Sequence, residues 1–241
     1  MNMDDKIIEI SNMVNYQSIV NDMYKDEVII YFEGENNKKF YSNFSEIQHC
    51  ILRGCTANGQ HSCIDIKNEI VNNENLNSIA IIDGDFCDDK EHENIFKIDF
   101  YSIENIVLME HGYFQELKTK LEKYYESEKD KGINLIKIRG NINDKRDVYS
   151  LDKSNNIHKQ FHCYIKNKIV NFQTYIKYMD LKEVVYDYSI FRSYSNKLSR
   201  DEKNECKKYI ETLFKHIKDK KLSKLFSKKE YESLSKILKQ V

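Results

Sequence analysis

The segment SIAIIDGD at residues 78–85 decides the fold, because a short apolar strand ends there directly in two acidic residues. Ser78–Ile82 is continuously apolar rather than alternating, which is typical of a strand that is buried on both faces of a sheet. A second segment of this kind, EVIIYF at residues 27–32, ends in the acidic run EGE. The two segments predict an α/β fold, with a mostly parallel sheet and acidic residues at the carboxyl ends of its strands.

Helical patterns alternate with these strands, as parallel connections require. Asn36 or Asn37 is expected to cap a helix that runs to about His49, with Phe40 and Phe44 on its apolar face. The sequence further predicts a short strand near Cys63–Ile64, a short helix after Asp65, a strand at Ile95–Ile98 and a helix from about Ser102 to Glu110.

The character of the chain changes after residue 110. Lysine-rich helical patterns occupy about residues 112–130, 157–168 and 199–240, and one strand is expected at Ile133–Ile138. We therefore predict an α/β domain over residues 1–110 and a mainly helical, basic region over residues 111–241. There is no clear linker between the two, so we expect the second region to pack on the first.

Composition favours a soluble globular protein of the cytoplasm. The chain has 241 residues, of which 40% are hydrophobic and 32% charged, and it holds no apolar run long enough for a transmembrane helix. The start, MNMDDKIIEI, lacks the basic and then apolar layout of a signal peptide. The six cysteines are accordingly expected to be reduced.

The charges are distributed unevenly along the chain. Residues 1–110 carry 8 basic and 21 acidic side chains, residues 111–196 carry 16 and 11, and residues 197–241 carry 14 and 7. An acidic part suited to cations is thus joined to a basic part suited to a polyanion. Solvated lysine-rich helix faces explain part of the basic excess, and the remainder favours a nucleic-acid partner.

The acidic strand ends have the chemistry of a magnesium site. Magnesium takes oxygen ligands and keeps several waters, so two or three carboxylates at one rim of a sheet suffice to hold it. Asp83 and Asp85 are separated only by Gly84, and both can turn towards one point. Glycine at this position leaves room for a phosphate or a water molecule to approach the backbone.

Three stretches resemble a known family. VIIYFEGENNKKFY and IAIIDGDFCDD are similar to the Toprim domain of topoisomerases, primases and overcoming-lysogenisation-type nucleases, in which a strand-end glutamate pairs with an Asp-x-Asp motif. The run NIFKIDFYSIENIVL further resembles the bacterial Toprim-like DUF4435 family, in which an aspartate-bearing strand leads into a helix that carries a glutamate. That family includes the effector nuclease of the PARIS anti-phage defence system, which an ATPase partner holds and which cleaves tRNA after its release.

The resemblance covers residues 27–110 and implies a role for four acidic residues. Glu33 would be the catalytic glutamate, as general base or metal ligand, and Asp83 and Asp85 would hold Mg²⁺ or Mn²⁺. Glu104 would be the helix acid beside them, although a hydrogen bond to Tyr101 or to a backbone amide is an equal alternative. The chain departs from the family at Asn37, where an aspartate is frequent. Asn37 either weakens metal binding or only caps the helix.

Other constellations allow other chemistry. In a haloacid-dehalogenase-type phosphatase Asp83 would be the nucleophile and Asp85 the acid, but Cys87 stands where that motif has Thr or Val. A zinc site would take its ligands from His49, Cys50, Cys55, His61 and Cys63. The spacing of these residues matches no common zinc-finger motif. His158 and His162 have chelating spacing without the glutamate of a metalloprotease motif, and Cys163 lacks an evident base.

Basic and apolar residues of the second region predict partners. A basic loop around Gly140 is expected to grip nucleic-acid phosphates through Lys137, Arg139, Lys145 and Arg146. The C-terminal apolar residues are expected to form a homodimer seam or to dock on an ATPase: Leu222, Leu225, Phe226, Leu234 and Ile237. The chain itself has no GxxxxGK[ST] phosphate-binding loop.

The sequence thus favours a metal-dependent nuclease that hydrolyses RNA or DNA. The resemblance further implies that tRNA is a candidate substrate and that the protein serves in phage defence under the control of a partner ATPase. A non-catalytic Toprim-like interaction module is the alternative, and Asn37 favours it.

Overall fold

The structure is a computed structural model, and it describes residues 27–54, 66, 68, 70–71, 77–84, 92–130, 167–182, 184–186, 188 and 221–239. The strands predicted near Cys63–Ile64 and at Ile133–Ile138 lie outside these residues. So do most of the helical stretch predicted at 157–168 and the first 22 residues, 199–220, of the stretch predicted at 199–240. Within the described part of the chain, no helix is long and apolar enough to cross a membrane.

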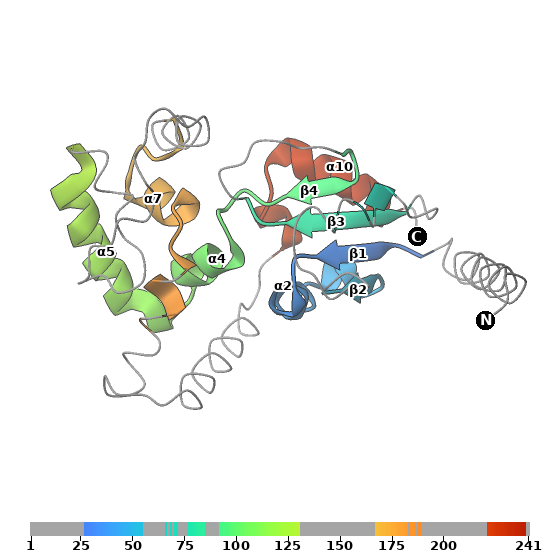
Figure 1. Cartoon of the computed structure of the whole chain (residues 1–241), viewed down its shortest axis with the longest axis horizontal. Helices are drawn as coiled ribbons and strands as arrows, with labels where there is room; N and C mark the ends of the chain where they lie inside the picture. The colour runs from blue at the N-terminus through green and yellow to red at the C-terminus, as the bar shows by residue number, and fades with distance from the viewer. Residues whose placement is uncertain are drawn as a thin grey trace, which may run out of the picture.

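The described strands form one parallel sheet in the order β2-β1-β3-β4 (Figure 1). These strands are β1 (Ile29–Phe32), β2 (Ile51–Arg53), β3 (Ser78–Ile82) and β4 (Ile95–Lys97). The predicted α/β fold with a mostly parallel sheet is confirmed. The sequence did not predict β2, because three residues with an exposed arginine at the end carry no periodic signal.

Both faces of the sheet are covered, which explains why the strands are continuously apolar. Since successive side chains of a strand point to opposite faces, Ile30, Ile79 and Phe96 join the larger core. Tyr31 and Ala80 point the other way, into a smaller cluster that also contains the buried helical residues Ile66 and Ile70.

The connection from β1 to β2 lies on the larger core. It contains α2 (Glu35–Tyr41) and the 3-10 turn η1 (Ser45–Ile47). The sequence prediction of one helix up to His49 was wrong. The Asn43 side chain donates to the carbonyls of Lys39 and Phe40, at 2.8 and 2.9 Å, and these bonds close the last turn of α2. The predicted apolar face of this segment is buried nonetheless.

A group of helices follows β4 and lies beyond the carboxyl ends of the strands (Figure 1). It consists of α4 (Ile103–Glu110), the turn η2 (Gly112–Phe114), α5 (Gln115–Glu128) and α7 (Phe172–Tyr178). Asn105 of α4 is fully buried, and its amide donates to the carbonyls of Ile176 and Met179 at 2.6 and 2.8 Å. Its carbonyl oxygen accepts from the Ser102 hydroxyl at 2.8 Å, so one side chain fixes α4 against α7.

The C-terminal segment returns to the sheet. It contains η4 (Leu222–Lys224) and α10 (Lys228–Leu238), which lies against β4 (Figure 1). The amide of Lys97 donates to Glu230 at 3.2 Å, and the amide of Asp99 donates to the Leu225 carbonyl at 2.7 Å. This packing corrects the prediction of an apolar dimer or ATPase seam, because four of its five residues are buried in the main core: Leu222, Leu225, Phe226 and Leu234.

Candidate metal centre

The strand order creates a topological switch point between β1 and β3. From β1 the chain first crosses to β2 on one side, and β3 then pairs with β1 on the other side. In open α/β sheets the crevice at the carboxyl ends of two such strands is where ligands bind. Glu33 directly follows β1 and Asp83 directly follows β3, so the fold places two predicted site residues at this point.

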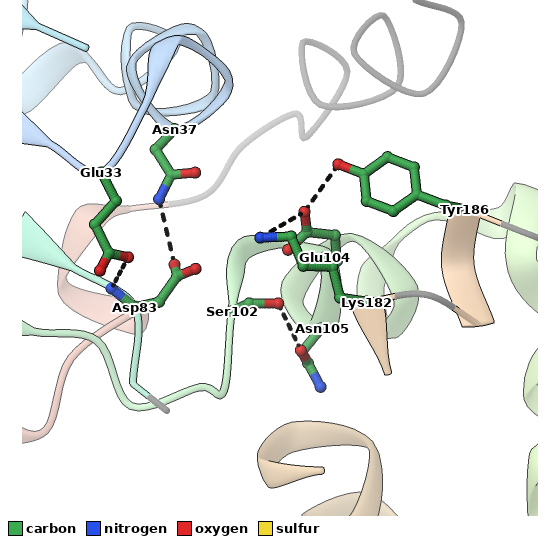
Figure 2. A network of polar contacts seen from close by, with 8 residues as sticks. All are labelled: Glu33, Asn37, Asp83, Ser102, Glu104, Asn105, Lys182 and Tyr186. Atoms are coloured by element: carbon green, nitrogen blue, oxygen red, sulfur yellow. Dashed lines mark hydrogen bonds and ion pairs between the residues drawn. The ribbon is translucent and has the colours of Figure 1, made fainter. Parts of the chain in front are cut away.

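Glu33 and Asp83 are in direct contact. An oxygen of the Glu33 carboxylate, Oε2, accepts a hydrogen bond of 3.0 Å from the Asp83 backbone amide (Figure 2). The bond joins the residue after one strand to the residue after its neighbour. It fixes the direction of the Glu33 side chain, and it brings the two carboxylates to one edge of the sheet.

Asn37 belongs to the same contact. Its amide donates to Asp83 Oδ1 at 3.3 Å, and its residue is buried inside α2 (Figure 2). The suggestion that Asn36 or Asn37 caps this helix was wrong, since Gly34 precedes its first residue. Asn37 thus places a neutral donor, rather than another carboxylate, beside Asp83.

Glu104 lies in the first turn of α4 and is almost completely buried. Its Oε1 accepts from the Tyr186 hydroxyl at 3.0 Å and forms an ion pair with the Lys182 ammonium at 3.6 Å (Figure 2). Among the residues that the structure describes, no hydrogen-bond donor reaches its second oxygen, Oε2. A buried carboxylate with one unsatisfied oxygen is costly unless a cation completes its shell.

Lys182 connects Glu104 with the Glu33–Asp83 pair. The pKa of the Lys182 ammonium is raised, most by Glu104 and further by Asp83 and Glu33, while its partial burial acts in the opposite direction. Figure 2 shows the ammonium on the side of Glu104 that faces Asp83. The three carboxylates therefore act on one region of space.

Tyr41 extends the centre towards the core. Its ring stacks on Phe32 with centroids 4.8 Å apart, and its hydroxyl is buried without a hydrogen-bond partner among the described residues. The pKa of Tyr41 is raised well above its usual value, chiefly by burial and also by the charges of Asp83 and Glu33. A neutral phenol thus borders the acidic pair.

Oxygen donors of this kind fit magnesium or manganese. The orphaned Oε2 of buried Glu104 is the observation that favours a cation here. Within the described ranges, no three acidic, histidine or cysteine side chains already converge as a closed metal-binding group. The predicted ligand Asp85 and the predicted phosphate-binding residues Lys137, Arg139, Lys145 and Arg146 lie outside the described residues.

Gly84 has a role other than the predicted one. A Cβ atom added to it would collide with the carbonyl oxygens of Ile98 and Phe100. The space that a side chain would take at Gly84 is therefore filled by the chain that leaves β4. Gly84 allows the ends of β3 and β4 to approach each other closely.

Asp99 is the aspartate of the run NIFKIDFYSIENIVL, and its carboxylate has a structural role. Its carboxylate accepts from the Lys177 ammonium at 2.6 Å and from the Tyr178 hydroxyl at 2.8 Å. The pKa of Tyr178 is raised by burial first and by its hydrogen bond to Asp99 second. Asp99 thus fastens the edge of the sheet to α7.

Cys50, a buried residue of the cluster considered for zinc, does not support a zinc site. Cys50 packs in the main core, and burial raises the pKa of its thiol to about 11, which opposes the thiolate form that zinc requires. Cys55, His61 and Cys63 lie outside the described residues, as do His158 and His162.

Sequence reasoning missed Lys182, Tyr186 and Tyr41 as members of this centre. Lys182 and Tyr186 have helical spacing, but nothing local indicates that they face an acid 78 or more positions earlier in the chain. In the sequence, nothing distinguishes Tyr41 from the other aromatic residues that are expected in the core. Comparison of the chain with protein-family models, with curated proteins and with solved structures found no match.

Proposed function

We propose that this protein is a metal-dependent nuclease that hydrolyses phosphodiester bonds in RNA or DNA, as its resemblance to Toprim-like enzymes implies. The observation that carries the proposal is the contact between Glu33 and Asp83 at the switch point of the sheet. Glu104, buried nearby with an unsatisfied oxygen, supports a cation-binding role for the same region.

Each residue has a part in this reaction. Bound Mg²⁺ or Mn²⁺ would supply positive charge against the phosphate and lower the pKa of a bound water. Asp83 and Glu104 would hold the ion, together with Asp85. Glu33, oriented by the Asp83 amide, accepts a proton from the attacking water. The water oxygen bonds to phosphorus, the ester bond to the departing oxygen breaks, and that oxygen takes a proton from a solvent water.

The basic second region is the proposed surface for the nucleic acid. Exposed lysines follow the sheet in the C-terminal segment, among them Lys221, Lys224, Lys228 and Lys229. Lysines in such numbers attract a phosphate backbone without base specificity. By resemblance, we extend the proposal to an anti-phage defence effector that acts on tRNA or DNA and that a partner ATPase restrains.

A non-catalytic interaction module is the second candidate, and Asn37 favours it. The Asn37 amide donates to Asp83 Oδ1, where a metal-binding relative frequently has another carboxylate. The two candidates differ in whether the acidic residues are needed for a chemical product.

Expression in bacteria tests the proposal. Wild-type protein and Glu33→Ala would be induced, with and without a neighbouring ATPase gene, and total tRNA and plasmid DNA would be examined. Fragments that require Glu33 support the nuclease and identify its substrate. Intact nucleic acids in all strains, with soluble protein present, would support the interaction module.

A further inference from the structure

Lys182 and Tyr186 lie one helical turn apart and meet the same oxygen of Glu104. The two contacts differ in kind. The Tyr186 hydroxyl makes a hydrogen bond of 3.0 Å, whereas the Lys182 ammonium lies 3.6 Å away, beyond ordinary hydrogen-bond length. The tyrosine therefore positions the carboxylate, and the lysine mainly supplies charge.

The burial of the pair is strongly unequal. The side chain of Glu104 is 2% exposed, whereas that of Lys182 is 46% exposed. A lysine ammonium is a compact charge on a flexible stem, and water can solvate it as soon as it turns outward. The buried carboxylate has no such freedom and depends on a cation that reaches it.

The Lys182 ammonium alone does not satisfy both oxygens of the Glu104 carboxylate. Lys182 contacts Oε1, while Oε2 remains without a hydrogen-bond donor in the part of the chain that the structure describes. Asp83 and Glu33 also act on Lys182, although more weakly than Glu104. A divalent cation carries twice the charge and binds carboxylate oxygens directly, so it would satisfy this group of acids better.

We propose that Lys182 is a displaceable counter-ion of this centre: it neutralises Glu104 in the metal-free protein and turns outward when a divalent cation binds there. The inference rests on the proposed function, because it concerns the same metal site. It assigns to Lys182, a residue of the second region, a role in setting the metal affinity. Positive charges in one place repel each other, so the lysine and the ion compete for Glu104.

Calorimetric titration of the full chain with Mn²⁺ at pH 8 tests this. Wild type would be compared with Lys182→Met, with the charge-preserving Lys182→Arg, and with Lys129→Met. Lys129 is a matched control, since it is 43% exposed and pairs with Glu126 on the surface of α5. We expect Lys182→Met to bind Mn²⁺ about tenfold more tightly than wild type, within the usual range of coupling between two binding events. Lys182→Arg and Lys129→Met should bind as wild type does.

Thermal unfolding gives an independent readout. With EDTA, Lys182→Met should melt below wild type, because Glu104 has lost its counter-ion, and Mn²⁺ should raise its Tm by more than it raises that of wild type. Lys182→Gln would replace Lys182→Met if the latter does not fold. If wild type binds Mn²⁺ and the charge-removing variant, Lys182→Met or Lys182→Gln, binds it equally or more weakly, this inference alone is overturned. No Mn²⁺ binding by wild type would overturn the proposed function, and this inference with it.

Discussion

The carboxylate of Glu33 accepts a hydrogen bond of 3.0 Å from the backbone amide of Asp83, although the two residues are 50 positions apart. The contact exists because β1 and β3 are neighbours in register, with Phe32 opposite Ile81, so that both strands end at one edge of the sheet. A parallel sheet thereby turns two distant acidic residues into one centre.

Asn37→Asp would restore the carboxylate that is frequent in the resembling family. It replaces the donor to Asp83 Oδ1 by a like charge, so we expect a loss of about 1–2 kcal/mol of stability in EDTA. Magnesium should reverse the loss and bind more tightly than in wild type. Urea unfolding with EDTA and with Mg²⁺ measures both effects. A variant as stable as wild type in EDTA would show that the Asn37–Asp83 contact is unimportant.

Glu104→Gln removes the buried charge and keeps the shape of the side chain. Because Tyr186 can still donate to the amide oxygen, we expect a folded protein whose stability in EDTA is not reduced. The affinity for Mn²⁺ should fall at least about tenfold, since a ligand is lost. Calorimetry and thermal unfolding on one preparation test the two parts. Unchanged Mn²⁺ affinity would remove Glu104 from the metal centre.

Asn105→Leu tests the junction between α4 and α7. The substitution leaves the buried carbonyls of Ile176 and Met179 without their donor, which we expect to cost about 3 kcal/mol. Asn171→Ala is the comparison, because it removes only the exposed cap of α7 and should cost about 1 kcal/mol. The measurement is urea unfolding of both variants. Equal losses would contradict the buried role of Asn105.

Stability should fall as the pH rises above about 10. Burial raises the pKa of Tyr175 above its ordinary value of 10.0, so the folded state keeps a proton that the unfolded state releases. The unfolded state then binds fewer protons, and the free energy of unfolding decreases with pH. The raised pKa of Lys182 acts in the same direction. Tyr175→Phe should weaken the decrease between pH 9.5 and 11.5, as measured by urea unfolding. An identical slope would contradict the assignment to Tyr175.

Local patterns predicted the framework of the centre well. The bounds of β3 follow from the apolar run that ends at Asp83, and α4 begins after Ser102 as its pattern indicates. Acidic residues at the ends of two buried strands predicted that both acidic motifs lie at one edge of the sheet, and the resemblance singled out Glu33 and Asp83 among them. These features are encoded within a few neighbouring residues, where hydrophobic periodicity is informative.

Long-range packing supplied what the sequence could not. The partners of Glu104 come from Lys182 and Tyr186, and the apolar residues near Leu225 cover the sheet rather than a partner. Helical spacing says that a face is apolar, but not which surface it meets. The early end of α2 depends on the Asn43 side chain, whose competition with the helix is equally hard to read from spacing.

Cleavage by the purified full chain tests the central claim most directly. Total tRNA and plasmid DNA would be incubated with wild type, Glu33→Gln and Glu126→Gln, each with Mg²⁺ and with EDTA. Glu33→Gln keeps an acceptor for the Asp83 amide, and Glu126 is a surface residue of α5. We expect Mg²⁺-dependent cleavage by wild type and Glu126→Gln, and a rate at least about 100-fold lower for Glu33→Gln. Cleavage of equal rate by Glu33→Gln, or cleavage that persists in EDTA, would contradict this claim.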